Sequence, residues 1–179
     1  MQGYASAGRV VTEAFHGAPH TVAHIKRFAL EAQTYNPLRV LAEHIVEGLG
    51  SKDFLSEILA IYYWVLNHTR YANDPKTIEL VRSPRLVVDR ILAGQVPSLD
   101  CDDLCCLLVA LFLSMGREVR IVTVAFKNAY YNNQRQYQHV YLQVREPRTL
   151  QWIVLDPVAA ESAGEMLRRV KAVKIWAVA

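Results

Sequence analysis

A run of ten residues in the middle of the chain, residues 104–113, consists of apolar side chains and two cysteines. It is far shorter than the roughly 20 residues that a helix needs to cross a bilayer. A helix that is apolar on every side must be surrounded by other elements of the fold. The run therefore predicts a buried helix at the centre of a globular domain.

The chain shows helical periodicity from residue 21 to the end of this run. Apolar residues recur at three- and four-residue spacing, and we predict helices over residues 21–33, 37–48, 51–66, 84–92 and 100–116. Pro37 and Pro84 stand at first helical positions, where the missing N–H costs nothing. Gly94 follows the last residue of one predicted helix, and Gly116 ends another, at positions where glycine is favoured.

After Gly116 the period changes to two, which is typical of strands. We predict strands over residues 118–126, 137–145, 150–156 and 171–178, joined in an antiparallel sheet. Residues 128–136 would form a loop, and residues 159–167 a small helical or loop excursion. Helices first and strands afterwards indicate an α+β fold. We expect a helical extension over residues 1–50 and the main domain over residues 51–179.

Composition excludes several classes of protein. Apolar residues make up 52% of the 179 residues and charged residues 21%, which is the balance of a globular chain. The net charge of +3 is too small to favour nucleic acid or an anionic membrane, so we predict neither as a partner. The first residues lack the pattern of a secretory signal. All three cysteines lie within six positions, so they cannot form a disulfide framework, and we predict a reducing, cytoplasmic location.

Cys101 stands in the first turn of the predicted central helix, within Asp100-Cys101-Asp102-Asp103. Unsatisfied N–H groups and the helix dipole stabilise a thiolate at this position and lower the pKa of the thiol. We interpret Asp100 as the N-cap and the next two acids as complements of the dipole. Asp103 is also a candidate for a supporting contact with the residues that surround Cys101. The same acids oppose a thiolate by like-charge repulsion.

Cys105 and Cys106 follow one turn deeper in the same helix. Free cysteines are most often small core residues, and we interpret these two in that way. Cys101, Cys105 and His139 could be proposed as a zinc site, but the chain contains no CxxC pair. A second possible metal site consists of His16, His20 and His24, which have the four-residue spacing of one helix face. These histidines have no cysteine or cluster of acidic ligands near them. We therefore predict no metal and no cofactor.

A nucleophilic thiolate needs a base, and the base needs a group that fixes its orientation. His139 and Asp156 lie on consecutive predicted strands. If residues 146–149 form a four-residue hairpin loop, Arg145 pairs with Leu150 and His139 lies directly opposite Asp156, with Cβ atoms about 5 Å apart. Alternation then places both on one face of the sheet. A bulge would shift this register.

These elements resemble the transglutaminase-like superfamily of papain-type cysteine enzymes. The resemblance covers about residues 54–158 and consists of Asp-Cys-Asp-Asp before an apolar helix, His-Val-Tyr on one strand and Trp-Ile-Val-Leu-Asp-Pro on the next. It implies a papain-like core in which the cysteine helix packs on the sheet carrying the histidine and the aspartate. It also implies Cys101 as the nucleophile, His139 as general base and acid, and Asp156 as the orienting residue.

The resemblance further implies a group that stabilises the oxyanion. Tyr71 resembles the aromatic residue that animal transglutaminases use, and Gln95 is the alternative, at the position that papain-like proteases use. Two residues depart from the family pattern. Leu99 stands where many members have glycine, and Tyr141 where many have tryptophan.

The implied reaction is acyl transfer from an amide bond of a protein or peptide through a thioester. Water as acceptor gives a protease or amidase, which the resemblance favours for small stand-alone bacterial or phage-borne members, and an amine gives a cross-linking transglutaminase. The alternative is a non-catalytic assembly module on the same fold. Residues 1–50, and a tyrosine-rich loop containing Tyr130, Tyr131 and Tyr137, would then contact a protein partner.

Overall fold

The computed structural model describes residues 10–14, 17–74, 78–126, 137–158, 163–164 and 170–178. The helices are α1 (Ala18–Gln33), α2 (Asn36–Ile45), α3 (Phe54–His68), α4 (Pro84–Leu92) and α5 (Cys101–Ser114). The strands are β1 (Val10–Ala14), β2 (Arg70–Tyr71), β3 (Ile78–Arg82), β4 (Ser98–Leu99), β5 (Val119–Ala125), β6 (His139–Arg145), β7 (Trp152–Leu155) and β8 (Ala172–Ala177). Every predicted helix and strand is present, and the mixed α+β fold class is confirmed.

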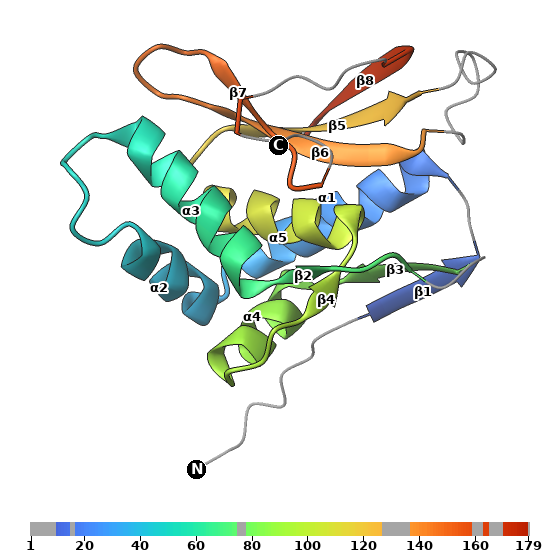
Figure 1. Ribbon diagram of the computed structural model, residues 1–179, viewed down its shortest axis with the longest axis horizontal. Helices are drawn as coiled ribbons and strands as arrows, with labels where there is room; N and C mark the ends of the chain where they lie inside the picture. Colours follow the sequence, from blue (N-terminus) through green and yellow to red (C-terminus); the bar gives the residue numbers. More distant parts are fainter. Residues whose placement is uncertain are drawn as a thin grey trace.

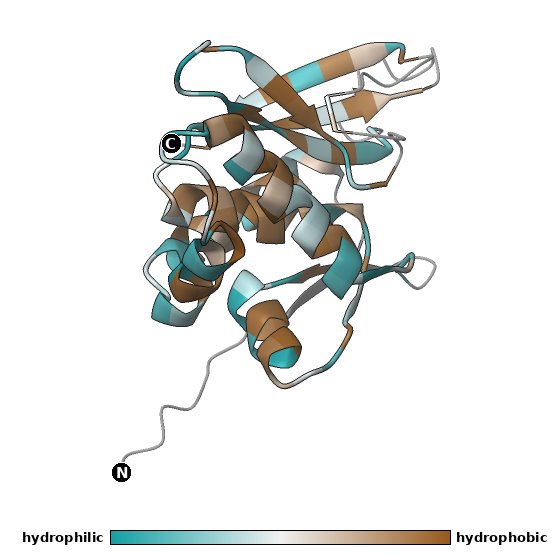
Figure 2. Ribbon diagram, turned by 60° about the vertical axis from the view of Figure 1, so that its left-hand side comes forward, coloured by the Kyte–Doolittle hydropathy of each residue, from teal (hydrophilic) through white to brown (hydrophobic). Residues whose placement is uncertain are grey.

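The predicted central helix is α5. Every residue from Asp102 to Leu113 is buried, because α1, α2, α3 and α4 contact it on one side and β5 and β6 on the other. Figure 1 shows the sheet above the helices, with α5 in their middle. In Figure 2 apolar residues are concentrated where the helices meet beneath the sheet. The all-apolar run is thus explained by burial on every face.

The main sheet has the order β7-β6-β5-β8, and all its neighbouring strands are antiparallel. Its two faces alternate as predicted. Val140, Leu142 and Val144 join the large core around α5. Tyr141 and Val154 belong to a separate small cluster on the other face, with neighbours from β5. The two central strands, β5 and β6, are therefore buried on both faces, whereas the edge strand β8 alternates with exposed residues.

The N-terminal helices share the core of the chain. Val22, Ile25 and Phe28 of α1 are buried in the same cluster as α5, and the Gln33 side chain donates a hydrogen bond to the Leu113 carbonyl at 3.3 Å. The boundary that we predict at residue 50 stays a prediction. The predicted loop 128–136, the tyrosines at 130 and 131, and most of the excursion 159–167 lie outside the described residues.

Two small sheets were not predicted. β1 pairs antiparallel with β3, placing Val10 beside Arg82, and β2 pairs parallel with β4, placing Tyr71 beside Leu99. A strand of two residues shows no periodicity, so β2 and β4 gave no signal in the sequence. Their pairing joins the chain after α3 to the segment that enters α5, as the two green strands in Figure 1 show.

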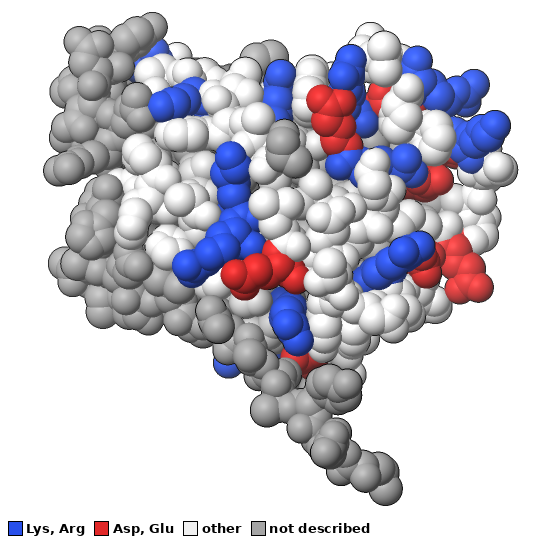
Figure 3. Space-filling view, turned by 180° about the vertical axis from the view of Figure 1, so that it is seen from behind, with Lys and Arg blue, Asp and Glu red and all other residues white. Residues whose placement is uncertain are grey.

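Charged side chains of both signs share the surface of the molecule (Figure 3). Figure 3 shows one face of the molecule, on which Asp and Glu side chains lie among the Lys and Arg side chains. None of the described helices has the length and apolar character needed to cross a membrane. The absence of nucleic-acid and membrane partners stays a prediction.

Candidate active site

The start of α5 is shaped by its N-cap, Asp100. The Asp100 side chain accepts a hydrogen bond from the Asp103 N–H at 3.3 Å, and its carbonyl accepts one from the Leu104 N–H at 3.1 Å. Capping satisfies donors that have no partner within the helix. The predicted cap is thereby confirmed. It fixes Cys101 as the first residue of the helix.

The three free thiols have unequal environments. Cys101 is partly exposed, whereas Cys105 and Cys106 are fully buried, with no accessible surface. Burial raises the pKa of both core thiols well above the usual range, so neither forms a thiolate readily. Their predicted packing role is confirmed. Cys101 alone combines a helix start with access to solvent, and its role as nucleophile stays a prediction.

His139 and Asp156 lie in contact. The Nε2 atom of His139 is 2.7 Å from Oδ2 of Asp156, and the exposed fractions of the two residues are 9% and 0%. Asp156 is held by further bonds: its Oδ1 accepts from the Val158 N–H at 3.0 Å, and its carbonyl accepts from the Tyr62 hydroxyl at 2.8 Å. A buried carboxylate fixed in this way orients the imidazole. Nδ1 is the ring nitrogen that does not contact Asp156, and the roles of His139 as base and Asp156 as orienting residue stay predictions.

The predicted register between β6 and β7 is wrong by two residues. Arg145 pairs with Trp152 rather than Leu150, because the connecting loop has six residues instead of four. Within it, the Glu146 carboxylate accepts hydrogen bonds from the Arg148 and Thr149 N–H groups. A shift of two residues keeps every side chain on its face. Asp156 consequently reaches His139 as a diagonal neighbour and not as a directly opposed one.

The β2–β4 ladder brings Tyr71 to the entry of α5. Tyr71 pairs with Leu99, and the Ala72 N–H donates to the Leu99 carbonyl at 2.9 Å. The Tyr71 hydroxyl donates to Oδ1 of Asn73 at 2.7 Å, and the residue is 45% exposed. Burial, followed by the charge of Cys101, raises the pKa of Tyr71. The phenol is therefore protonated at neutral pH, as a hydrogen-bond donor must be.

The structure places the alternative oxyanion donor, Gln95, in an exposed turn after α4. The N–H of Gln95 closes this turn on the Arg90 carbonyl at 3.0 Å. Tyr71, by contrast, pairs with Leu99, two residues before Cys101, so the geometry favours Tyr71. The role of either residue stays a prediction.

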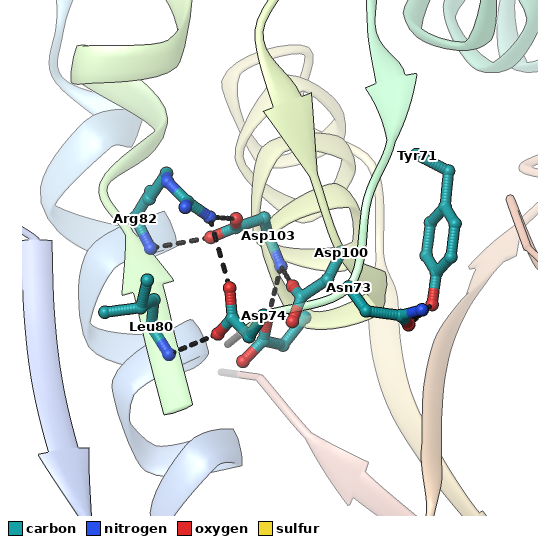
Figure 4. Close-up of polar contacts among 8 residues, drawn as sticks. Tyr71, Asn73, Asp74, Leu80, Arg82, Asp100 and Asp103 are labelled. Carbon is teal, nitrogen blue, oxygen red and sulfur yellow. Dashed lines mark hydrogen bonds and ion pairs between the residues drawn. The ribbon is translucent and has the colours of Figure 1, made fainter. Parts of the chain in front are cut away.

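The Asp103 side chain contacts β3. Its carboxylate accepts the Arg82 N–H at 2.7 Å and forms an ion pair with the Arg82 guanidinium. Burial raises the pKa of Asp103 to about 7, and the charge of Asp100 acts in the same direction, whereas Arg82 opposes both. Figure 4 shows this contact and its connection to Asp74. Arg82 and Asp74 were not singled out as functional residues, because their partners are distant in sequence.

The carboxylates of Asp100, Asp102 and Asp103 lie within 4.8 Å of one another. They form the one group with suitable spacing for a metal ion among the residues that the structure describes. The Asp103 N–H donates to both Asp100 and Asp102, and the Arg82 guanidinium contacts Asp103, so helix capping and one ion pair account for the cluster. The predicted absence of a metal stays a prediction.

The contribution of the Asp100 cap to the stability of the protein can be tested without an assay of activity. Asp100→Ala is expected to lower the free energy of unfolding by about 1 kcal/mol, the usual cost of losing an N-cap. Asp53→Ala is the matched control, because Asp53 caps α3 through an equal 3.3 Å bond to the Ser56 N–H. Urea unfolding measures both variants. An Asp100→Ala protein as stable as the wild type would contradict this assignment.

The chain matches one protein family and is similar to two solved structures. A family model described as the transglutaminase-like superfamily matches residues 40–157. No curated protein matches the chain. One similar solved structure, a putative protease from Parabacteroides distasonis, has 15% identity and a TM-score of 0.50, and the match covers 70% of this chain and 24% of that one. A putative cysteine protease from Cytophaga hutchinsonii has 18% identity and a TM-score of 0.48, with 95% and 58% covered.

Proposed function

The chain belongs to the transglutaminase-like superfamily, and from this premise we propose that it is a cysteine-dependent acyl-transfer enzyme that acts on amide bonds of proteins or peptides. The buried pair of His139 and Asp156, with 2.7 Å between Nε2 and Oδ2, is the observation that carries the proposal. The resemblance inferred from the sequence is confirmed at the level of the family. The substrate, the reaction and the residue roles are our proposal.

In the proposed reaction the Cys101 thiolate attacks the carbonyl carbon of an amide. The carbonyl oxygen becomes an oxyanion, which the Tyr71 hydroxyl and the Cys101 N–H stabilise. Collapse of this intermediate breaks the C–N bond, and protonated His139 gives its Nδ1 proton to the departing amine. The product is a thioester on Cys101. His139 then takes a proton from the acceptor, which bonds to the thioester carbonyl carbon while the C–S bond breaks and releases the Cys101 thiolate. Asp156 holds the imidazole throughout.

Charge interactions support this arrangement. The charge of Cys101 contributes to the raised pKa of Tyr71, and the charge of Asp156 contributes to that of Cys105. Tyr71 pairs with Leu99, two residues before Cys101, and β6, the strand that carries His139, contacts α5. The proposal requires the Cys101 sulfur to be within about 4 Å of Nδ1 of His139 in the reactive state.

The acceptor decides the class of enzyme. We propose water, and hence a protease or amidase, because this acceptor needs no binding site of its own. A protein cross-linking transglutaminase is the second candidate. Asp100, Asp102 and Asp74 all act on Tyr71 by their charge, and such carboxylates favour the approach of a cationic lysine amine. The same proposal includes a cytoplasmic location, which we infer because none of the three cysteines forms a disulfide.

Alkylation by iodoacetamide tests the proposed nucleophile. At neutral pH we expect selective labelling of Cys101, mapped by mass spectrometry of peptides, because the helix start and His139 stabilise its thiolate. Cys105 and Cys106 should stay unlabelled, since they are fully buried. His139→Ala should slow the labelling of Cys101 and leave the fold intact. Equal labelling of all three thiols, or no labelling of Cys101, would favour the non-catalytic assembly module.

The acceptor is tested separately. Incubation with a fluorescent primary amine and a glutamine-bearing protein such as casein measures transfer, and release of new N-termini from the same protein measures hydrolysis. We expect hydrolysis to dominate. Amine incorporation without cleavage would assign the chain to the cross-linking class instead.

A further inference from the structure

The strand β3 has two edges, and both are occupied. β1 pairs along one of them. On the other, the Leu80 N–H donates to Oδ2 of Asp74 at 2.5 Å and the Arg82 N–H donates to Oδ1 of Asp103 at 2.7 Å. Two carboxylates therefore take the place of a neighbouring strand. Figure 4 shows both contacts on the same side of β3.

These two carboxylates come from the two elements that carry the proposed reaction. Asp74 follows Tyr71 by three residues, and Asp103 follows Cys101 by two. The Arg82 side chain contacts both: it forms an ion pair with Asp103 and lies 3.8 Å from Oδ1 of Asp74. One guanidinium thus bridges the segment after β2 and the first turn of α5.

We infer that Arg82 is a positioning residue for the proposed acyl transfer, because its bridge between Asp74 and Asp103 holds Tyr71 beside the start of the Cys101 helix. The inference rests on the proposed function. Arg82 acts through the tyrosine and does not itself touch the substrate.

The weakness of the β2–β4 ladder explains why such a bridge is needed. Each strand has two residues, and the bonds that join the two segments include those from the Arg70 N–H to the Pro97 carbonyl at 3.0 Å and from the Ala72 N–H to the Leu99 carbonyl at 2.9 Å. Short pairings of this kind are marginal on their own. The Tyr71 side chain is 45% exposed, so packing restrains it little. Its hydroxyl bonds to Asn73, the residue next to Asp74.

The bridge suits arginine better than lysine. The guanidinium is planar and has five donors, so it can serve two carboxylates at once, whereas an ammonium acts as a point charge. The Arg82 side chain is 19% exposed and the Asp103 side chain 0%. Limited access to water strengthens such a contact and makes the loss of one partner costly.

Two reactions of Cys101 distinguish a positioning role of Arg82 from a general effect of its loss on the fold or on the thiolate. Acylation by p-nitrophenyl acetate passes through an oxyanion and depends on Tyr71, whereas alkylation by iodoacetamide forms no oxyanion and depends on the thiolate. At about pH 8, where a carboxyl of pKa about 7 is mostly ionised, we expect Arg82→Met to slow acylation by about tenfold or more. Alkylation should change by less than about threefold. Arg82→Lys should recover part of the acylation rate.

A double-mutant cycle identifies the residue through which Arg82 acts. Tyr71→Phe should slow acylation strongly in the wild type and only weakly in Arg82→Met, because the tyrosine is already displaced there. The matched control is Arg117→Met, which breaks an ion pair with Glu57 of similar exposure, 14% and 15%, beyond the opposite end of α5. It should lower stability without slowing acylation. Additive effects of Tyr71→Phe and Arg82→Met would overturn the inference.

Hydrogen exchange keeps the inference testable without any activity. The Ala72 N–H reports the β2–β4 ladder, and Arg82→Met should speed its exchange more than Arg117→Met does. If the wild type is not acylated at Cys101, the proposed function fails, while faster Ala72 exchange still supports the bridge. Ala72 exchange that is equal in the two variants would overturn the positioning role.

Discussion

Cys101→Ala is expected to abolish acylation by p-nitrophenyl acetate, with a fall in rate of at least about 10³-fold. Of the three thiols, Cys101 alone combines partial exposure with a position in the first turn of α5. Removing it leaves two buried thiols whose pKa values are raised by burial. Neither can replace it as nucleophile at neutral pH.

Cys105→Ala is the matched control for this prediction. It removes a sulfur from the same helix, one turn deeper, at a position without accessible surface. We expect a loss of stability of about 1 kcal/mol from the small cavity and an acylation rate close to that of the wild type. Stopped-flow release of p-nitrophenol measures both variants. Acylation that survives Cys101→Ala and disappears in Cys105→Ala would transfer the role to the core thiol.

The central helix shows why part of the fold could be predicted. Residues 104–113 had to be buried whatever surrounded them, since an all-apolar helix is unstable in water. The Asp100 cap was equally local, because a cap depends on residues within one turn. Such features need no knowledge of the rest of the chain, and the structure agrees with them.

The geometry of a loop and contacts between distant residues could not be predicted in this way. The register of β6 and β7 depends on hydrogen bonds of Glu146 within its loop, and the choice of loop length is not visible in alternation. The face of each residue was still right, because a shift by two residues preserves it. The pairing of Tyr71 with Leu99 joins two-residue strands, and the bridge of Arg82 joins residues 21 positions apart. Neither leaves a periodic pattern.

The second large effect on the acylation rate concerns Asp156, which contacts His139 as a diagonal neighbour. Asp156→Ala is expected to slow acylation by about 10²- to 10⁴-fold, because the imidazole loses the group that sets its tautomer and orientation. The lost carboxylate also stabilises the imidazolium, so the pKa of the Cys101 thiol should rise. The rate of alkylation at neutral pH should accordingly fall and recover as the pH increases. A profile of alkylation rate against pH measures this shift.

Asp156→Asn separates orientation from charge. An amide oxygen can still accept a hydrogen bond from Nε2 of His139, and an asparagine serves this purpose in papain-like proteases. We therefore expect Asp156→Asn to retain much more activity than Asp156→Ala. Tyr62→Phe is the control for structure, because it removes only the 2.8 Å bond to the Asp156 carbonyl and should cost about 1 kcal/mol of stability. If Asp156→Ala reacts as fast as Tyr62→Phe, the contact between His139 and Asp156 serves only the fold.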